Sequence, residues 1–168
     1  MGDTEEPAGF SFEQRAGFEA RQIDQDRTLE AMHRLEKALS DAAPGREASW
    51  RASVLGALAV LGTAAAEEVT NAERPDSLLS DLARTQPRLR NRARALRLHY
   101  HKLCETIDSL RREIGEDPAA GADFADVRQR LGWVLTALRH QRARESDILY
   151  EAYFDAFKLD LGEEHAAE

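Results

Sequence analysis

The amino-acid sequence predicts one all-α domain, an antiparallel up-down four-helix bundle preceded by a flexible N-terminal arm. The chain has 168 residues, which is about the usual size of a single domain. Four segments carry apolar residues at the spacing of a helix face, and breaks rich in Pro and Gly separate them. No segment alternates apolar and polar residues as a half-buried strand does. Four amphipathic helices bury their apolar faces most simply by alternating up and down around one core.

The bundle domain is expected to span residues 15–162, with the arm over residues 1–14 and a disordered acidic tail over residues 163–168. The arm contains Phe10 and Phe12, which either dock on the bundle or bind a partner. We favour docking, because large exposed apolar patches are uncommon on monomeric proteins.

Apolar periodicity predicts the first two helices. The first is expected over residues 13–41, and the sequence Ala-Pro-Gly at 43–45 then breaks it. Its apolar face consists of Phe18, Leu29, Met32, Leu35 and Leu39. The second is expected over residues 49–73, with Ser49 as its N-cap and Arg-Pro-Asp at 74–76 as its end. Its apolar face consists of Val54, Leu55, Leu58, Leu61 and Val69.

The second half of the chain predicts two more long helices. Residues 77–83 either form a short helix that ends near Pro87 or lead directly into the third long helix. The third helix has the most regular apolar stripe: Leu89, Ala93, Leu96, Tyr100, Leu103, Ile107, Leu110 and Ile114. A loop at 115–121 precedes the fourth helix, expected over residues 123–160 with Gly162 as its stop. Its inward residues are Leu131, Val134, Leu135, Leu138, Leu149 and Ala152.

Composition and charge restrict the class of function. Hydrophobic residues make up 42% and charged residues 32% of the chain, as in folded soluble proteins. The 31 Asp and Glu against 23 Lys and Arg give a formal charge of -8, which disfavours nucleic acid as a partner. An anion or nucleic-acid site stays a weaker alternative at one cluster of arginines: Arg84, Arg88, Arg90, Arg92, Arg94 and Arg97. We expect these to spread around a helix and to pair with acidic residues.

The sequence favours a cytoplasmic location. Cys104 is the only cysteine, which excludes an intrachain disulfide and a thiolate metal cluster. The first 14 residues lack the basic start and the apolar run of a signal peptide. The longest apolar stretch, residues 54–66, is too short and too rich in Ala and Gly to span a bilayer, so no membrane association is expected.

Two carboxylates share the phase of the apolar faces. Glu36 lies about 40° from the centre of the apolar face of the first helix, and Glu145 lies on the inward stripe of the fourth. A buried carboxylate must be paired, protonated or coordinated. In one interpretation both pair with Arg or Lys, or bond to Tyr100, Gln141 or Arg142, as a buried polar layer that fixes the register of the helices.

In a second interpretation the two carboxylates form a metal or small-ligand site with His33 and His99. Bundle cores hold metals where His and carboxylates of facing helices point inward. His33 lies about 100° from the centre of its apolar face, and His99 flanks the third stripe by about 70°. His140 lies nearly opposite the inward stripe of the fourth helix.

The order of helices and several short strings resemble the hemerythrin-like family over about residues 24–162. The strings are Met32-His33-Arg34-Leu35-Glu36, Leu96 to Leu110, Leu138-Arg139-His140-Gln141, Glu145, and Ile148-Leu149-Tyr150-Glu151-Ala152. The resemblance implies a four-helix bundle whose inward His and carboxylate ligands hold two irons.

The chain departs from the family pattern on the two middle helices. The family has an H-x-x-x-E pair on the second helix, where this chain has Thr63 and alanines before Glu67. The family has an H-x-x-x-H pair on the third helix, where Leu103 and Cys104 stand in this chain. The fourth helix keeps a family-like H-x-x-x-x-E spacing. The resemblance therefore implies an incomplete metal site made of His33, Glu36, His99, His140 and Glu145.

The leading hypothesis is a non-catalytic hemerythrin-like bundle of bacterial type, which has lost most di-iron ligands and acts as an interaction or regulatory module. No Ser-His-Asp or Cys-His set can be recognised, and no cofactor is expected. The alternative is a protein that binds iron and senses or handles oxygen, nitric oxide or peroxide. A homo-oligomer or a protein partner is expected at a group of aromatic residues, with burial at the bundle end as an equal alternative. These residues are Phe10, Phe12, Tyr150, Tyr153, Phe154 and Phe157.

Overall fold

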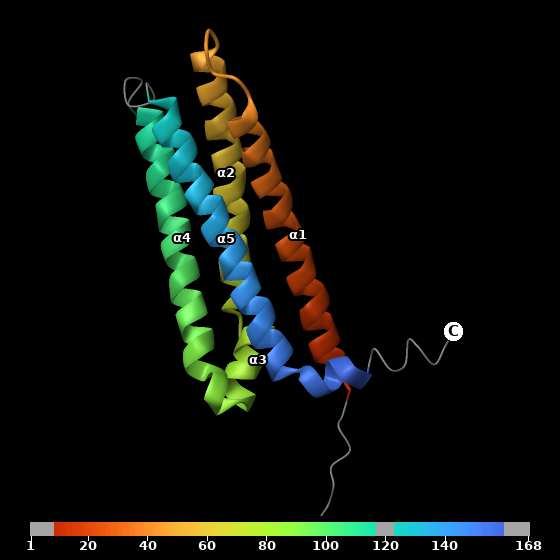
Figure 1. Ribbon diagram of the computed structural model, residues 1–168. Coiled ribbons are helices and arrows are strands. Elements are labelled where there is room, and N and C mark those ends of the chain that lie inside the picture. Colours follow the sequence, from red (N-terminus) through yellow and green to blue (C-terminus); the bar gives the residue numbers. More distant parts are fainter. Residues whose placement is uncertain (1–8, 117–122, 160–168) are drawn as a thin grey trace, which may run out of the picture.

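The computed structural model describes residues 9–116 and 123–159, and every regular element in these two ranges is helical. Residues 1–8, Gly162 and the predicted tail 163–168 lie outside the described part. The elements are α1 (Phe12–Ser40), α2 (Glu47–Ala72), α3 (Leu78–Thr85), the 3-10 helix η1 (Pro87–Leu89), α4 (Arg90–Glu116) and α5 (Phe124–Ala152). The long helices lie side by side (Figure 1), and the all-α class is confirmed for the described residues.

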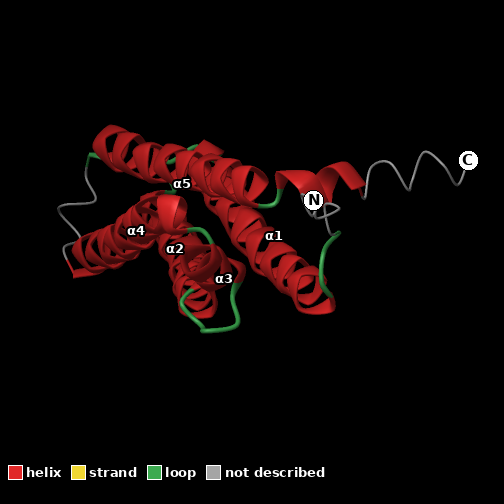
Figure 2. Ribbon diagram, turned by 90° about the horizontal axis from the view of Figure 1, so that it is seen from below, coloured by secondary structure: helices red, strands yellow, loops and turns green. Residues whose placement is uncertain are grey.

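The four long helices surround a common interior. The turn between α1 and α2 lies at one end of the molecule, and α3 with η1 lies at the other end (Figure 1). α2 packs against both α1 and α4, while α5 packs mainly against α4 and more loosely against α1. Seen from below, α5 covers one side of the molecule, next to α4 and α1 (Figure 2).

A capping box fixes the start of α1. The hydroxyl of Ser11 accepts a hydrogen bond from the backbone N–H of Gln14, and the Gln14 side chain accepts one from the N–H of Ser11. The helix therefore begins at Phe12, inside the arm that we predicted over residues 1–14. That boundary was wrong for the last three residues of the arm, because the reciprocal cap satisfies the first N–H groups of the helix.

α2 begins two residues before its predicted N-cap. Arg46 occupies the N-cap position and offers no side-chain hydrogen bond. Gly45 has a φ of 76°, which turns the chain sharply before the helix. Its N–H donates to the carboxylate of Glu47 at 2.9 Å. The prediction of Ser49 as the N-cap was wrong, because the turn at Gly45 decides where the helix starts.

α2 is long and apolar enough to be compared with a membrane-spanning helix. Over an 18-residue window its mean hydropathy is 1.4, so that by length and composition alone it could cross a bilayer. The prediction that no segment spans a bilayer was based on residues 54–66 alone. The whole helix has 26 residues, so its length does not exclude a membrane span. Of that window 44% is buried inside the protein, and the core helix of a soluble protein passes the same test.

A separate short helix joins α2 to α4. Residues 78–83, for which a lead-in was the alternative, belong to α3. Ser77 is its N-cap: the hydroxyl accepts from the N–H of Ser80 at 3.2 Å and donates to the carbonyl of Ala72 at 2.6 Å. Pro87 starts η1, where its missing N–H costs nothing. The predicted stripe along α4 is buried at all of its positions, which confirms it.

α5 is shorter than predicted. It ends before Tyr153, and residues 154–159 resume a helix in a different direction (Figure 1). The prediction of one helix over residues 123–160 was therefore wrong at this point. The hydroxyl of Tyr153 donates to Asp81 at 2.7 Å, and its ring packs on Phe18 at 5.5 Å between centroids. These contacts between distant segments hold the bend.

Two apolar clusters fill the interior. The larger lies toward the α1–α2 turn and includes Met32, Leu58 and Ile107. The smaller lies toward α3 and includes Leu82 and Ile148. Between them, buried polar side chains interrupt the apolar faces of the long helices.

Candidate functional site

The candidate site is this layer of buried polar side chains, which we call the polar layer. Every long helix contributes to it at positions that continue its apolar face. The polar layer consists of Arg21, Asp24 and Thr28 of α1, Glu68 and the half-buried Asn71 of α2, Tyr100 of α4, and Gln141 and Glu145 of α5. Because buried polar groups need hydrogen-bond partners, the bonding of this layer decides what it can do.

Arg21 joins two buried carboxylates from different helices. Its Nη1 lies 2.6 Å from Oε1 of Glu68, and its Nη2 donates to Oε2 of Glu145. Burial lowers the pKa of Arg21, but the charges of Glu145 and Glu68 outweigh burial and leave the pKa raised. The guanidinium therefore stays charged, and one cation serves two anions.

Glu68 is the better satisfied of these two carboxylates. Besides the ion pair with Arg21, it accepts hydrogen bonds from the hydroxyls of Thr28 and Tyr100. Burial raises the pKa of Tyr100, and the charge of Glu68 raises it further. The Tyr100 hydroxyl thus keeps its proton and remains a donor.

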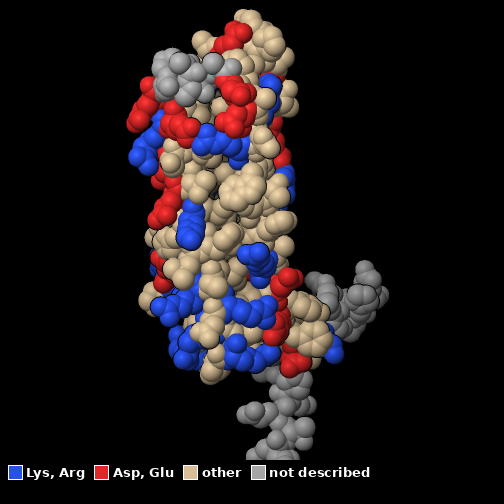
Figure 3. All heavy atoms as spheres, turned by 60° about the vertical axis from the view of Figure 1, so that its left-hand side comes forward, with Lys and Arg blue, Asp and Glu red and all other residues tan. Residues whose placement is uncertain are grey.

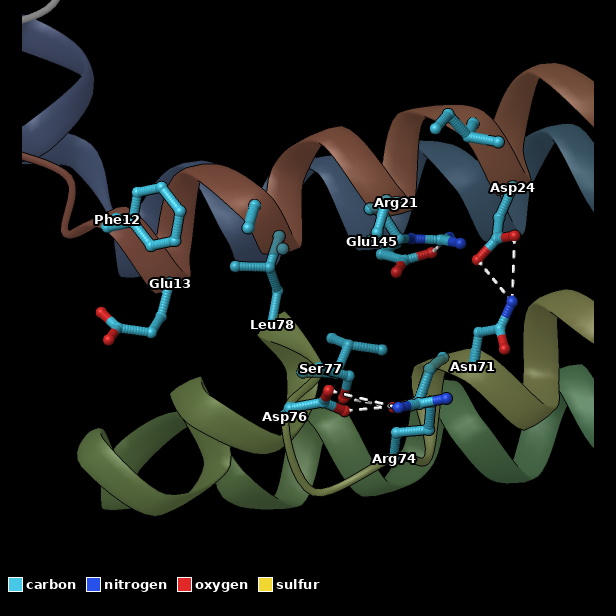
Figure 4. Close-up of a pocket in the computed structure, with 16 residues that line it drawn as sticks. Phe12, Glu13, Arg21, Asp24, Asn71, Arg74, Asp76, Ser77, Leu78 and Glu145 are labelled. Atoms are coloured by element: carbon cyan, nitrogen blue, oxygen red, sulfur yellow. Dashed lines mark hydrogen bonds and ion pairs between the residues drawn. The ribbon is translucent and has the colours of Figure 1, made fainter.

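Glu145 is incompletely bonded. Its side chain is almost wholly buried, and Oε2 is bonded to Arg21, but Oε1 accepts no hydrogen bond. Burial raises the pKa of Glu145, although the Arg21 guanidinium opposes this. In Figure 4 one oxygen of Glu145 is joined to Arg21, and the other points away from it.

A groove of about 540 Å³ leads from the surface to this carboxylate. It lies between α1 and the segment formed by the end of α2 and the start of α3 (Figure 4). Its deep end is polar, with Arg21, Asp24, Asn71 and Glu145. Its walls are mainly apolar, with Ala16, Ala20, Ala72, Leu78 and Leu79. We call this space the α1–α3 groove.

Two contacts shape the α1–α3 groove. Both carboxylate oxygens of Asp24 accept from the Asn71 side-chain amide at 3.0 Å, which ties α1 to α2 beside the deep end. Nearer the surface, Gly17 lets α1 approach α3, because a Cβ at this position would lie 3.1 Å from Leu78. The groove therefore has a closely packed wall and a polar floor.

Both the nitrogen and the oxygen of the Gln141 side-chain amide are hydrogen-bonded. Its Nε2 donates to the carbonyl of Leu96 at 2.9 Å, which leaves Oε1 to accept from Nδ1 of His99 at 2.7 Å. His99 is half-buried beside a second, smaller groove of about 210 Å³ between α4 and α5.

The five residues considered for a metal do not converge. Glu36 forms an ion pair with Arg139, while Glu145 and His99 have the partners described above. His33 and His140 are exposed. Within residues 9–116 and 123–159, no three His, Cys, Asp or Glu side chains are grouped so that they could hold a metal ion. The described residues therefore do not fit a di-iron centre, and the two carboxylates lie in ion pairs.

Arg21 was missed at the level of sequence, although a signal for it exists. Arg21, Asp24 and Thr28 continue the apolar spacing of α1 that runs on through Ala31 and Leu35, at intervals of three and four residues. Three polar residues in the core phase of a helix indicate a buried polar segment.

The arginine cluster is largely paired. Arg84 lies 2.8 Å from Asp81, and both Arg88 and Arg92 form ion pairs with Glu151. Arg97 donates to the carbonyl of Ala72 and to Ser80. Basic side chains gather toward the lower end of the face shown in Figure 3, where acidic side chains also lie. The expected pairing with acidic residues is thus confirmed for Arg84, Arg88 and Arg92, whereas Arg97 bonds to uncharged groups.

The aromatic residues divide into two groups. Phe10, Phe18, Tyr153 and Phe157 pack on one another, with ring centroids 4.9 to 6.0 Å apart. Phe10 is thus docked, as we favoured, whereas Phe12 is exposed, so the prediction of docking was wrong for Phe12. Tyr150 and Phe154 are also exposed, although Tyr150 stacks on Phe157.

No family model matches the chain, and neither a curated protein nor a solved structure shows significant similarity to it.

Proposed function

We propose that this protein is a non-catalytic binding module, an antiparallel four-helix bundle of hemerythrin-like architecture that holds a small ligand in the α1–α3 groove. The observation that carries this function is the groove itself, which ends on the incompletely bonded carboxylate of Glu145. In Figure 1 the α1–α2 turn lies at the opposite end from α3, and the end of α4 and the start of α5 lie at the end of the α1–α2 turn, which supports the up-down arrangement. In an interaction or regulatory role, binding of the ligand would change how the protein contacts a partner.

The groove has the character of a small-molecule site. Such sites measure about 300–1,000 Å³, are lined mainly by apolar groups, and contain a few converging polar groups. The α1–α3 groove holds about 540 Å³, and its apolar walls converge on Arg21, Asp24 and Glu145. Iron binding has less support, because Glu36 and Glu145 are engaged with arginines.

Binding in the groove can be tested with 1-octanol as an apolar probe, followed by amide chemical shifts in NMR spectra. We expect saturable shifts of amides in α1 and α3. The variant Ala20→Trp places a large ring in the groove and should weaken binding at least about tenfold. Ala52→Trp is the matched control, because Ala52 is an exposed alanine of α2 that does not line the groove. Equal weakening by both variants would contradict the proposed function, as would the absence of saturable binding by every apolar probe, charged or uncharged.

A further inference from the structure

The lining of the α1–α3 groove has an excess of negative charge. Four carboxylates line the groove, those of Glu13, Asp24, Asp76 and Glu145, against the two guanidinium groups of Arg21 and Arg74. Arg74 is engaged by Asp76 at 3.1 Å near the surface. Arg21 is shared with Glu68, a further carboxylate behind the floor. At the deep end the carboxylates of Asp24 and Glu145 face the single lining guanidinium of Arg21. Arg27 also lies 3.7 Å from Asp24, but it is bound more closely to Glu67, at 2.6 Å, so the charge that a ligand meets at this end is negative.

Two side chains at the deep end of the groove have atoms without a hydrogen-bond partner. Glu145 is 2% exposed, and its Oε1 has no donor although it is buried among protein atoms. A buried carboxylate oxygen without a donor is costly, so a ligand N–H that reaches it gains a charge-assisted hydrogen bond. Nε of Arg21 also lacks a partner and would attract an acceptor, while Nη1 of Arg21 and Oε1 of Glu68 form no hydrogen bond but lie 2.6 Å apart as an ion pair. A cationic ligand is favoured over an anionic one at this end, because Arg21 is already neutralised by the carboxylates of Glu68 and Glu145.

The remainder of the groove suits hydrocarbon. Its walls carry the small side chains of Ala16, Ala20 and Ala72, so an alkyl chain or a ring has room beside α1. Two large apolar side chains stand exposed at the rim, Phe12 at 83% and Ile23 at 60%. A bare inorganic cation would gain nothing from these surfaces, whereas an apolar body attached to a cationic nitrogen would cover them.

We propose that the ligand of the α1–α3 groove is an apolar organic cation, a primary alkyl or arylalkyl amine in its ammonium form. The ammonium donates to Oε1 of Glu145, and the hydrocarbon lies along α1 and α3 toward Phe12. This inference rests on the proposed function, since it names the class of ligand that the groove takes.

The test compares three probes of equal chain length at pH 7 by calorimetry and NMR: octylammonium, 1-octanol and octanoate. We expect octylammonium to bind at least about tenfold more tightly than 1-octanol, and octanoate to bind most weakly. In Glu145→Gln the preference for octylammonium over 1-octanol should fall to within about twofold, with 1-octanol binding unchanged. Glu13→Gln is the matched control, because it removes one carboxylate from the rim of the same groove and should leave most of the preference intact.

The outcomes separate this inference from the proposed function. Equal affinity for octylammonium and 1-octanol in the wild-type protein, with binding still blocked by Ala20→Trp, overturns the cation inference and leaves the groove as a binding site. Retention of the full preference in Glu145→Gln also overturns it. If none of the three probes binds, the proposed function fails as well. The wild-type comparison decides without any variant, so a misfolded Glu145→Gln protein would not prevent a result.

Discussion

At the scale of single residues, Glu145 is a buried carboxylate whose hydrogen bonding is incomplete. Its carboxylate shares Arg21 with Glu68, and one of its oxygens has no donor. Removing water from a carboxylate costs more than one shared ion pair returns, so its charged form is destabilised in the folded protein. The raised pKa of Glu145 expresses this balance.

The raised pKa of Glu145 predicts a pH dependence of stability. Between the unfolded value of 4.5 and the raised folded value, the folded protein binds more protons than the unfolded chain. The contribution of Glu145 to the free energy of unfolding therefore falls as the pH rises through this window. Glu145→Gln cannot ionise, so the free energy of unfolding of the variant minus that of the wild type should increase with pH from about 4.5 upward. Urea denaturation at a series of pH values measures this difference.

Glu113 provides a control of opposite sign. A hydrogen bond from Arg130 lowers the pKa of Glu113, so its contribution to stability is present above its unfolded value and is lost as the pH falls. For Glu113→Gln the free energy of unfolding of the variant minus that of the wild type should therefore decrease as the pH rises toward 4.5. Parallel pH profiles for the two variants would contradict the assignment of burial as the cause at Glu145.

At the scale of helices, α4 was predictable and the end of α5 was not. In α4 every third or fourth residue from Leu89 to Ile114 is apolar and buried, so the stripe alone identifies the face. In α5 the pattern continues beyond Ala152, but contacts of Tyr153 with α3 and with the start of α1 bend the chain. Periodicity describes one helix at a time, whereas bends depend on its neighbours.

The candidate site was partly predictable for the same reason. The helical phase placed Glu145 inside, and it is buried. The same phase placed Glu36 near the core, but it lies half-buried at the surface with Arg139. The partner of Glu145 was not predicted, because the position of Arg21 opposite α5 depends on how two distant helices pack.

The N-cap of α1 gives a prediction at this scale. Ser11→Ala removes the acceptor for the N–H of Gln14 and should lower the free energy of unfolding by about 1 kcal/mol. Ser53→Ala is the matched control, because Ser53 is exposed in the interior of α2, where alanine is the better helix former. Thermal and urea denaturation measure both variants. Equal stability of Ser11→Ala and the wild type would show that the cap does not contribute.

At the scale of the whole molecule, the polar layer divides the core into two apolar clusters. An apolar interior tolerates a shift of one helix past another, whereas Arg21 can reach Glu68 and Glu145 in one register only. The ion pairs cross from α1 to α2 and from α1 to α5. The layer thus specifies which turns of the helices face each other, and it places the unpaired oxygen of Glu145 at the end of the groove.

This view predicts how the layer responds to removal of its charges. Arg21→Met leaves Glu68 and Glu145 buried without their cation and should lower the free energy of unfolding at pH 7 by about 3–5 kcal/mol. Adding Glu68→Gln and Glu145→Met removes both unpaired charges, while Gln keeps an acceptor for the hydroxyls of Thr28 and Tyr100. The triple variant should therefore recover most of the loss, because replacing a buried ion pair as a unit costs far less than breaking it. Urea denaturation of the wild type, the single variant and the triple variant measures both steps. A triple variant no more stable than Arg21→Met would mean that the attraction between the charges, rather than the need to neutralise them, holds the helices together.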